Sequence, residues 1–408
     1  MNFGLIGGKL AHSYSPQIHS HLGDYSYVLV EKKPEELEQL LRSDTFDGFN
    51  VTIPYKSTVI PYCHELSPVA TRLGAVNTIV RRKDGTLIGH NTDYFGFESM
   101  LLQSGIDICG KKALVLGSGG TSKTAVAVLQ DKGADVVVIS RTGQNNYENL
   151  HLHADAALIV NTTPVGMYPK TGIAPVSLDD FPHLEGVLDV IYNPARTELL
   201  QMAENRGIVA MNGLLMLVAQ AKESAEWFMG HAIPDGKIQE IHALLTRQME
   251  NIILIGMPGS GKSTIGKLLA EKSGKEFVDA DALIAETAGC TIPDIFAAQG
   301  EAGFRALETQ VLAQVGKASG LVIATGGGCV TREENYPLLH QNGRIFCLER
   351  ELAKLATDGR PLSQATKMEE MYRIRKALYE RFADYTVSND GAPQCAAEKI
   401  LSIWEGDL

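Results

Sequence analysis

The stretch Gly256-Met257-Pro258-Gly259-Ser260-Gly261-Lys262-Ser263-Thr264 decides the fold of the carboxy-terminal part of this chain. It follows an apolar run over residues 251–255, typical of a buried parallel strand, and precedes a helical pattern over residues 265–270. This strand–loop–helix order is the context that a phosphate-binding loop requires. Its glycines let successive backbone N–H groups point at one phosphate, while Lys262 can reach the outer phosphates and the Ser263 hydroxyl can ligate Mg²⁺. The motif therefore predicts a nucleoside triphosphate site formed by Gly259, Ser260, Gly261, Lys262, Ser263 and Thr264.

Length and composition limit the classes of protein that this chain can represent. At 408 residues it is too long for one ordinary domain, so two or three are expected. The net charge of −11 and the lack of a Lys/Arg run argue against a nucleic-acid-binding surface. Small molecules are therefore the expected partners, and no oligomeric state is predicted.

The cysteines and the apolar segments indicate a compartment. Six cysteines lie far apart without a Cys-x-x-Cys pair, which favours neither a disulfide framework nor a zinc site. No apolar run approaches about 18 residues, and the amino terminus lacks the basic start and apolar core of a signal peptide. We therefore expect a soluble, cytoplasmic protein that does not bind a membrane.

Short apolar strands alternate with helical stretches from end to end, which is typical of an α/β fold with parallel sheets. A second βαβ unit precedes the phosphate-binding loop: it has a strand over residues 112–116, a glycine-rich loop, a helix over residues 124–129 and a strand over residues 136–139. A turn followed by a helix with apolar side chains at helical spacing predicts a boundary near residues 232–250.

The carboxy-terminal half carries further motifs in a definite order. They are FVDAD at 277–281, GEAGFR at 300–305 with Glu308, ATGGG at 324–328, RPL at 360–362 and RKALY at 375–379. In this order the motifs resemble shikimate kinase, a small member of the P-loop nucleoside monophosphate kinase group, across residues 251–408. The resemblance implies ATP and Mg²⁺ as ligands and shikimate as the substrate.

The resemblance and side-chain chemistry together suggest roles for the kinase residues. Asp281 can accept a proton from the attacking hydroxyl or hold that hydroxyl in line, and Asp279 would order Mg²⁺ together with Ser263. Arg305 and Arg375 suit a bidentate clamp on the substrate carboxylate, a task that lysine performs less well.

Two glycines and a lid arginine complete the predicted kinase site. The backbone of Gly327 and Gly328 can approach the substrate where a Cβ would clash, and Arg360 can contact ATP and stabilise the transferring phosphoryl group. A plainer interpretation stays open: the two aspartates could be ordinary loop residues, and Arg305 could form a surface salt bridge with Glu308.

The amino-terminal half carries a second set of motifs at expected strand ends. They are HSYSP at 12–16, NVTIPYK at 50–56, GAVNT at 74–78, GHNTD at 89–93, NTTPVGM at 161–167 and GLLML at 213–217. Polar residues this dense are costly unless they face a polar ligand. The set resembles shikimate dehydrogenase along the whole of residues 1–230. The resemblance implies a substrate site in a first domain and a dinucleotide on a Rossmann-like unit, in the cleft between them.

Lys56 and Asp93 are the predicted catalytic pair of this half. Reduction of a ketone by hydride leaves an alkoxide that needs a proton, and a lysine ammonium held by a carboxylate can deliver it. Taken without its motif, Lys56 would more often be a solvated loop lysine. The resemblance adds substrate-binding residues: Ser13, Ser15, Thr52, Asn77, Asp93, Tyr192 and Gln220.

The end of the second strand in the dinucleotide unit indicates the cofactor. An NAD site favours Asp or Glu there for the ribose hydroxyls, whereas this chain has Ser140-Arg141-Thr142. An arginine can bind a 2′-phosphate that an acid would repel, so NADP(H) is expected. The short distance from Arg141 to Asn161 suggests that a βα unit is missing. The implied cofactor-binding residues are Gly117, Ser118, Gly119, Gly120, Thr121, Arg141, Thr142, Val190 and Gly213.

Together the two resemblances predict a bifunctional enzyme of aromatic amino-acid biosynthesis. It would reduce 3-dehydroshikimate to shikimate with NADPH and then phosphorylate shikimate with ATP. The expected domains are residues 1–100 for substrate binding with a helix in 210–235 returning to it, 101–235 for NADP, 236–250 as a connecting helix, and 251–408 for the kinase. Two alternatives stay open: a quinate or quinate/shikimate dehydrogenase half, and a nucleotide-binding metabolite sensor with one inactive site.

Overall fold

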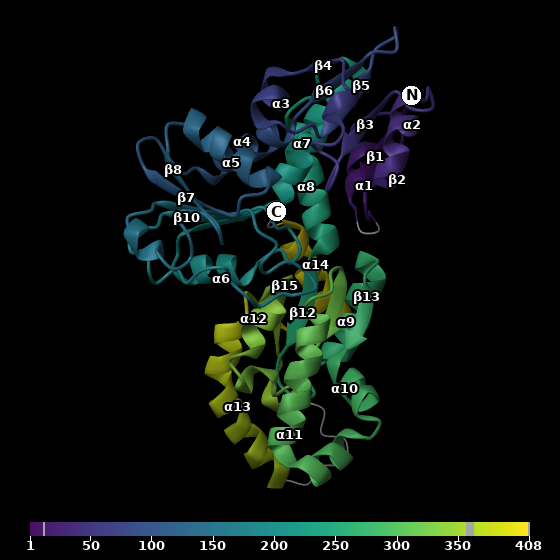
Figure 1. Cartoon of the computed structure of the whole chain (residues 1–408). Coiled ribbons are helices and arrows are strands. Elements are labelled where there is room, and N and C mark those ends of the chain that lie inside the picture. Colours follow the sequence, from purple (N-terminus) through teal and green to yellow (C-terminus); the bar gives the residue numbers. More distant parts are fainter. Residues whose placement is uncertain (11–12, 356–362, 407–408) are drawn as a thin grey trace. The chain divides into compact units, whose positions relative to one another are not determined.

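The computed structural model of the chain describes residues 1–10, 13–355 and 363–406 and contains three β-sheets. It divides into two compact units. The first comprises residues 1–166, 173–192 and 199–244, and the second comprises residues 167–172, 193–198 and 245–408. The first unit holds two of the sheets and the second unit holds one, and the predicted α/β class with parallel sheets is confirmed (Figure 1).

The first sheet of the first unit is mixed, with the strand order β2-β1-β3-β5-β6-β4. Its strands are β1 (Asn2–Gly7), β2 (Ser26–Glu31), β3 (Gly48–Val51), β4 (Glu65–Leu66), β5 (Thr78–Arg81) and β6 (Leu87–His90). Its helices are α1 (Ser15–Ser20), η1 (Pro34–Glu36), α2 (Leu37–Arg42), η2 (Ile60–Tyr62) and α3 (Pro68–Leu73). Apolar side chains from α2 and α3 cover one face of the sheet, where Phe49 and Ile79 lie in the core. The ring of Phe228 from α7 (Leu214–Met229) stacks on Phe3 of β1.

The second sheet of the first unit is entirely parallel, in the order β11-β10-β9-β7-β8. Its strands are β7 (Lys112–Leu116), β8 (Asp135–Ile139), β9 (Leu158–Asn161), β10 (Gly186–Asp189) and β11 (Val209–Asn212). The helix α4 (Asp93–Ser104) precedes β7, while α5 (Gly120–Asp131), η3 (Leu150–His153) and α6 (Glu198–Asn205) lie between the strands. The helices α7 and α8 (Gly236–Met249) follow β11. Only the short helix η3 lies between β8 and β9, so β8 is an edge strand and the sheet lacks the βα unit whose loss the short spacing suggested.

Alternating side chains explain why the second sheet is covered on both faces. Ala113 and Val115 of β7 pack with residues of α4, α5 and α7, whereas Leu114 and Leu116 pack with residues of α6. A strand points successive side chains to opposite faces, so a continuous apolar run such as 113–116 belongs in a sheet buried on both sides.

The sheet of the second unit is also parallel, in the order β13-β14-β12-β15-β16. Its strands are β12 (Asn251–Ile255), β13 (Glu276–Asp279), β14 (Leu321–Ala324), β15 (Gly343–Glu349) and β16 (Tyr385–Ser388). Its helices are α9 (Lys262–Ser273), α10 (Ala280–Ala288), α11 (Ile292–Val315), η4 (Cys329–Thr331), α12 (Asn335–His340), η5 (Leu352–Lys354), α13 (Ser363–Phe382) and α14 (Pro393–Gly406). The β12 side chains Ile252 and Leu254 pack under α9 and α14, and Ile253 and Ile255 pack under α11 and α13.

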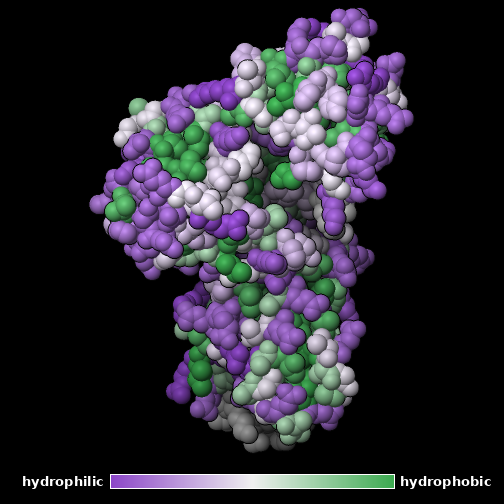
Figure 2. Space-filling view, in the orientation of Figure 1, coloured by the Kyte–Doolittle hydropathy of each residue, from purple (hydrophilic) through white to green (hydrophobic). Residues whose placement is uncertain are grey.

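The surface is predominantly hydrophilic on the face shown in Figure 2, with apolar residues in separate patches. Among the described residues, no helix combines the length and the apolar character of a membrane span.

Candidate active sites

Strand pairing brings three polar loops of the first unit to one edge of its mixed sheet. β3 and β5 run antiparallel with Asn50 opposite Thr78, and β6 runs antiparallel to β5. The end of β3, the start of β5 and the end of β6 therefore meet. The loops that follow or precede these points carry Lys56, Asn77 and Asp93, which are far apart in the sequence and close in space.

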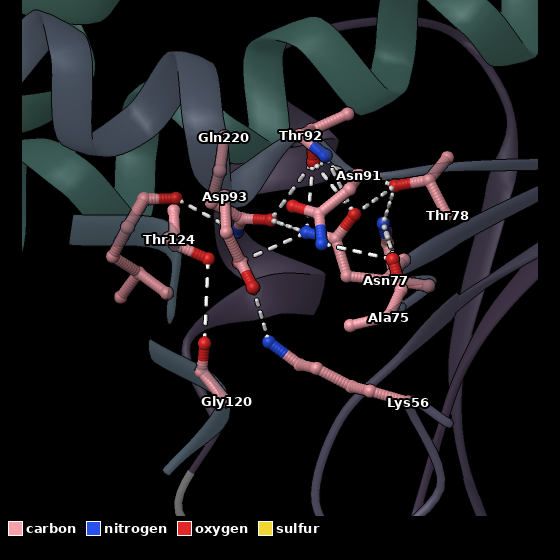
Figure 3. Close-up of polar contacts among 12 residues, drawn as sticks. Lys56, Ala75, Asn77, Thr78, Asn91, Thr92, Asp93, Gly120, Thr124 and Gln220 are labelled. Carbon is pink, nitrogen blue, oxygen red and sulfur yellow. Dashed lines mark hydrogen bonds and ion pairs between the residues drawn. The ribbon is translucent and has the colours of Figure 1, made fainter. Parts of the chain in front are cut away.

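An ion pair between Lys56 and Asp93 forms the centre of this site (Figure 3). Nζ of Lys56 lies 2.5 Å from Oδ2 of Asp93, and both side chains are largely buried. The other carboxylate oxygen, Oδ1, accepts a hydrogen bond of 2.9 Å from Nδ2 of Asn77. The backbone N–H of Thr92 donates to Oδ1 of Asn77 at 2.7 Å, so the amide of Asn77 faces Asp93 with its nitrogen. The carboxylate is thus held in one orientation, with its lysine on one side.

One cavity of about 610 Å³ collects the predicted dehydrogenase residues. It is lined by all the predicted substrate-binding side chains and by three of the predicted cofactor-binding residues: Ser13, Ser15, Thr52, Lys56, Asn77, Asp93, Tyr192 and Gln220, with Thr121, Val190 and Gly213. Gln220 comes from α7, and its Nε2 donates to the carbonyl of Leu217 at 2.9 Å. Hydroxyls, amides, a carboxylate and two ammonium groups line the same space, which suits a small polyhydroxylated molecule.

A second cavity of about 630 Å³ lies over the carboxyl ends of β7, β8 and β9. It is lined by four of the predicted cofactor-binding residues: Gly117, Ser118, Gly119 and Arg141. No hydrogen bond or ion pair to the Arg141 guanidinium occurs among the described residues. Gly120 begins α5, and Thr142 is exposed beside Arg141.

Sequence reasoning missed two polar residues that line the first cavity, Lys9 and Asn50. Asn50 is buried, accepts a hydrogen bond of 2.7 Å from the Tyr27 hydroxyl and donates one of 2.8 Å to Oγ of Ser224. Lys9 follows the end of β1. The signal for both was a polar residue near the end of an apolar strand.

The phosphate-binding loop of the second unit joins β12 to α9, as expected from its flanks. Nζ of Lys262 donates to the carbonyls of Gly256 and Met257 at 2.9 and 3.0 Å. Gly261 has φ of 96°, and a Cβ there would lie 2.5 Å from Nδ2 of Asn389, which itself donates to the carbonyl of Ser260 at 2.7 Å. Gly259 and Thr264 are exposed at the loop and in the first turn of α9.

The two predicted aspartates lie beside this loop. Asp279 accepts a hydrogen bond of 2.7 Å from the Ser263 hydroxyl and caps α10 through the N–H groups of Asp281 and Ala282. Hydroxyl and carboxylate oxygens together suit Mg²⁺. Burial raises the pKa of Asp281, and Asp279 adds to the rise, while Lys262 opposes it. Oδ1 of Asp281 is buried without a hydrogen-bond partner among the described residues.

Arg305 is held by a buried glutamate, the partner proposed in the plainer interpretation of the sequence. Its Nη1 donates to Oε2 of Glu308 at 2.7 Å, but Glu308 is fully buried, so this is an interior pair and not a surface salt bridge. Burial raises the pKa of Glu308, and its hydrogen bond to Arg305 opposes that rise.

The three consecutive glycines explain how these groups pack so closely. A Cβ at Gly326 would lie 2.6 Å from Oδ1 of Asp281, and one at Gly328 would lie 2.1 Å from Nη2 of Arg305. The carbonyl of Gly327 accepts hydrogen bonds from Nη1 of Arg375 at 3.1 Å and from the Tyr379 hydroxyl at 2.5 Å. The glycines therefore make room for the site's own side chains. Arg360, the predicted lid residue, lies outside the described residues.

Comparison with known proteins decides the families. The chain is 36% identical over 263 residues to the shikimate dehydrogenase (NADP(+)) of Clostridium perfringens, a match that covers 59% of this chain and 96% of that protein. The chain belongs to the shikimate dehydrogenase family. Residues 5–79 also match the family model for the shikimate dehydrogenase substrate binding domain.

Solved structures of shikimate dehydrogenases resemble the same part of the chain. The enzyme of Peptoclostridium difficile is 39% identical with a TM-score of 0.55, covering 60% of this chain and 98% of its own. The Thermus thermophilus enzyme, solved in complex with NADP(H) and shikimate, is 30% identical with a TM-score of 0.55, covering 59% of this chain and 98% of its own.

Residues 258–405 match the shikimate kinase family model. Both resemblances noted in the sequence are therefore confirmed. The chain joins a shikimate dehydrogenase to a shikimate kinase domain, and so combines an oxidoreductase with a kinase of the shikimate pathway.

Proposed function

We propose that this chain reduces 3-dehydroshikimate to shikimate with NADPH and then phosphorylates shikimate at the new hydroxyl with ATP and Mg²⁺. The observation that carries the proposal is that each family's charged residues stand assembled in its own unit, the Lys56–Asp93 pair in one and Lys262 with Asp281 in the other. The product of the first reaction is the substrate of the second. A shared intermediate gives a chemical reason for the fusion.

In the dehydrogenase, Lys56 is the proposed acid. NADPH supplies the hydride to the C3 carbonyl carbon, and the carbonyl oxygen then needs one proton. The Lys56 ammonium can donate that proton, while Asp93 keeps the lysine in place through the contact of 2.5 Å. Asn77 fixes the carboxylate from the other side. Asp93, Ser13, Ser15 and Thr52 can hold the hydroxyls and the carboxylate of the substrate.

In the kinase, Asp281 is the proposed base for the attacking hydroxyl. The hydroxyl oxygen forms a bond to the γ-phosphorus of ATP, the bond from that phosphorus to ADP breaks, and the hydroxyl proton leaves. A carboxylate with a raised pKa is a better acceptor for this proton. Mg²⁺, ordered by Ser263 and Asp279, would neutralise phosphate charge, and Lys262 would hold the outer phosphates. Arg305 and Arg375 would clamp the substrate carboxylate.

A coupled assay tests both steps at once. Purified protein receives 3-dehydroshikimate, NADPH, ATP and Mg²⁺, and NADPH loss and ADP release are followed together. We expect NADPH loss to begin first and ADP release to follow as shikimate accumulates. Absence of both signals would contradict the proposal, and NADPH loss without ADP release would restrict the activity to the dehydrogenase unit.

The two alternatives have their own measurements. A quinate or quinate/shikimate dehydrogenase would oxidise quinate with NAD at a rate comparable with shikimate and NADP. A metabolite sensor would bind a nucleotide in one unit without turnover there. The presence of Lys56, Asp93, Lys262 and Asp281 favours turnover in both units.

Arg141 provides a prediction about cofactor choice. Arg141→Ala should weaken NADPH binding by about 10- to 150-fold, the range for loss of a hydrogen bond to a charged group, with little change for NADH. The dissociation constants of both cofactors are measured by fluorescence titration. Arg42→Ala, an exposed arginine on α2, is the control. Equal weakening of both cofactors would mean that Arg141 does not recognise the 2′-phosphate.

Arg375 provides a prediction about carboxylate recognition in the kinase. Arg375→Lys should raise the KM for shikimate about tenfold or more, since lysine lacks the planar fork that pairs with a carboxylate. The KM for ATP should stay nearly constant. Arg373→Lys, an exposed arginine on the same helix, is the matched control. A rise confined to the ATP KM would assign Arg375 to the nucleotide.

A further inference from the structure

The shortened segment after β8 folds back on the end of that strand. The backbone N–H of Ser140 donates to the carbonyl of Asn145 at 3.1 Å, which closes a tight loop. Gly143 packs closely against this turn, since a Cβ there would lie 2.6 Å from Oγ of Ser140. The segment that stands where a βα unit is missing is therefore a compact loop.

Asparagine side chains brace this loop on both sides of Tyr147. The N–H of Asn146 donates to Oδ1 of Asn149 at 2.8 Å, and Nδ2 of Asn149 donates to the carbonyl of Gln144 at 3.0 Å. The N–H of Glu148 donates to Oδ1 of Asn146 at 2.9 Å. Side-chain to backbone bonds of this kind fix local conformation without a helix or strand.

Tyr147 lies between a hydrophobic core and the second cavity. With Leu150 and Ala174 it packs against the apolar cluster on one face of the parallel sheet. Tyr147 also lines the cavity of about 630 Å³, together with Arg141 and the glycine-rich loop 117–119. Burial raises the pKa of the Tyr147 hydroxyl, and the charge of Arg141 opposes the rise.

We propose that Tyr147 is the aromatic wall for the adenosine end of the dinucleotide. The inference rests on the proposed function, since it assumes that NADP(H) binds over the glycine-rich loop. Tyr147, held by its braced loop, and Arg141, which has no hydrogen-bond or ion-pair partner among the described residues, line the same cavity. Together they offer an apolar ring for adenine and a cation for phosphate. The short loop thus contributes to affinity in place of the missing βα unit.

The proposal separates two properties of the cofactor site. Stacking on an aromatic ring recognises the face of adenine, which NADPH and NADH share, so Tyr147 should affect both equally. A cation beside the 2′ position acts on NADPH alone. Tyr147 therefore contributes to the affinity for both cofactors, and Arg141 contributes to the preference for NADPH over NADH.

Binding measurements on the full-length protein test this division. NADPH, NADH and 2′,5′-ADP are titrated calorimetrically into the wild type and into Tyr147→Ala, Tyr147→Phe and Arg141→Ala. We expect Tyr147→Ala to weaken all three ligands by about 10-fold, the scale of loss for base stacking on an aromatic side chain. Tyr147→Phe should stay within about 2-fold, because the ring remains.

Control variants separate loss of stacking on Tyr147 from unfolding and from failure of the cofactor site itself. Leu152→Ala changes an exposed residue of the same segment and should leave all three affinities unchanged. If Tyr147→Ala unfolds, Tyr147→Leu keeps apolar packing without an aromatic face and should show the same loss. Wild-type affinity in Tyr147→Leu, or in a folded Tyr147→Ala, overturns the proposal while Arg141→Ala still reports on the cofactor site. A wild type that binds none of the three ligands contradicts the proposed function itself.

Discussion

Lys56→Ala should slow the dehydrogenase reaction by orders of magnitude and leave the kinase reaction intact. The variant lacks the ammonium that lies 2.5 Å from Asp93, and with it the proposed donor of the proton that completes the C3 hydroxyl. A positioned acid contributes about 10²–10⁴-fold to such a step. NADPH oxidation with 3-dehydroshikimate should fall by this factor, while ADP release with supplied shikimate continues at the wild-type rate.

Two further measurements make this expectation specific. NADPH affinity of Lys56→Ala should match the wild type, because the loss is in proton transfer and not in cofactor binding. Lys83→Ala, which changes an exposed lysine between β5 and β6, should retain both activities. If Lys56→Ala reduces 3-dehydroshikimate at nearly the wild-type rate, Lys56 is a solvated loop lysine and not the proton donor.

Asp281→Asn should have the opposite effect. Asparagine keeps the size of the side chain but cannot accept the proton of the attacking hydroxyl, so phosphoryl transfer should fall by about 10²–10⁴-fold. NADPH oxidation should continue unchanged. Glu286→Gln, an exposed acid on the same helix α10, is the matched control and should retain kinase activity.

Mixing the two variants tests whether the sites are independent. Each supplies the activity that the other lacks, so the mixture should convert 3-dehydroshikimate to shikimate 3-phosphate, with a lag while shikimate diffuses between molecules. If either single substitution silences both reactions in a folded protein, the model of two separate sites is wrong.

The phosphate-binding loop shows what could be predicted from sequence. Its chemistry depends on adjacent residues in one turn, so the order of glycines, Lys262 and Ser263 already specifies which groups face a phosphate. The parallel sheets were predictable for the same reason, since continuous apolar runs and short loops are local features. The cofactor interpretation rested on the dipeptide Ser140-Arg141 at a strand end, again a local pattern.

Other parts of the sites depend on contacts between residues far apart in the chain. The buried state of Glu308 beside Arg305 could not be predicted, because the spacing of these two residues on a helix suits an exposed pair equally well. The role of the triple glycine is similar: the sequence indicated close approach, and only the packing shows that Asp281 and Arg305 are among the groups that approach.

The sequence by itself determined the fold class, the two families and the residue types that each reaction needs, because those properties are written in short, contiguous motifs. The tertiary structure decided how these residues combine. The antiparallel pairing of β3, β5 and β6 joins Lys56, Asn77 and Asp93 into one hydrogen-bonded group, and the folding of a shortened loop brings Tyr147 to the cavity that Arg141 lines. Strand register and loop packing depend on long-range burial of apolar side chains, which no local pattern encodes.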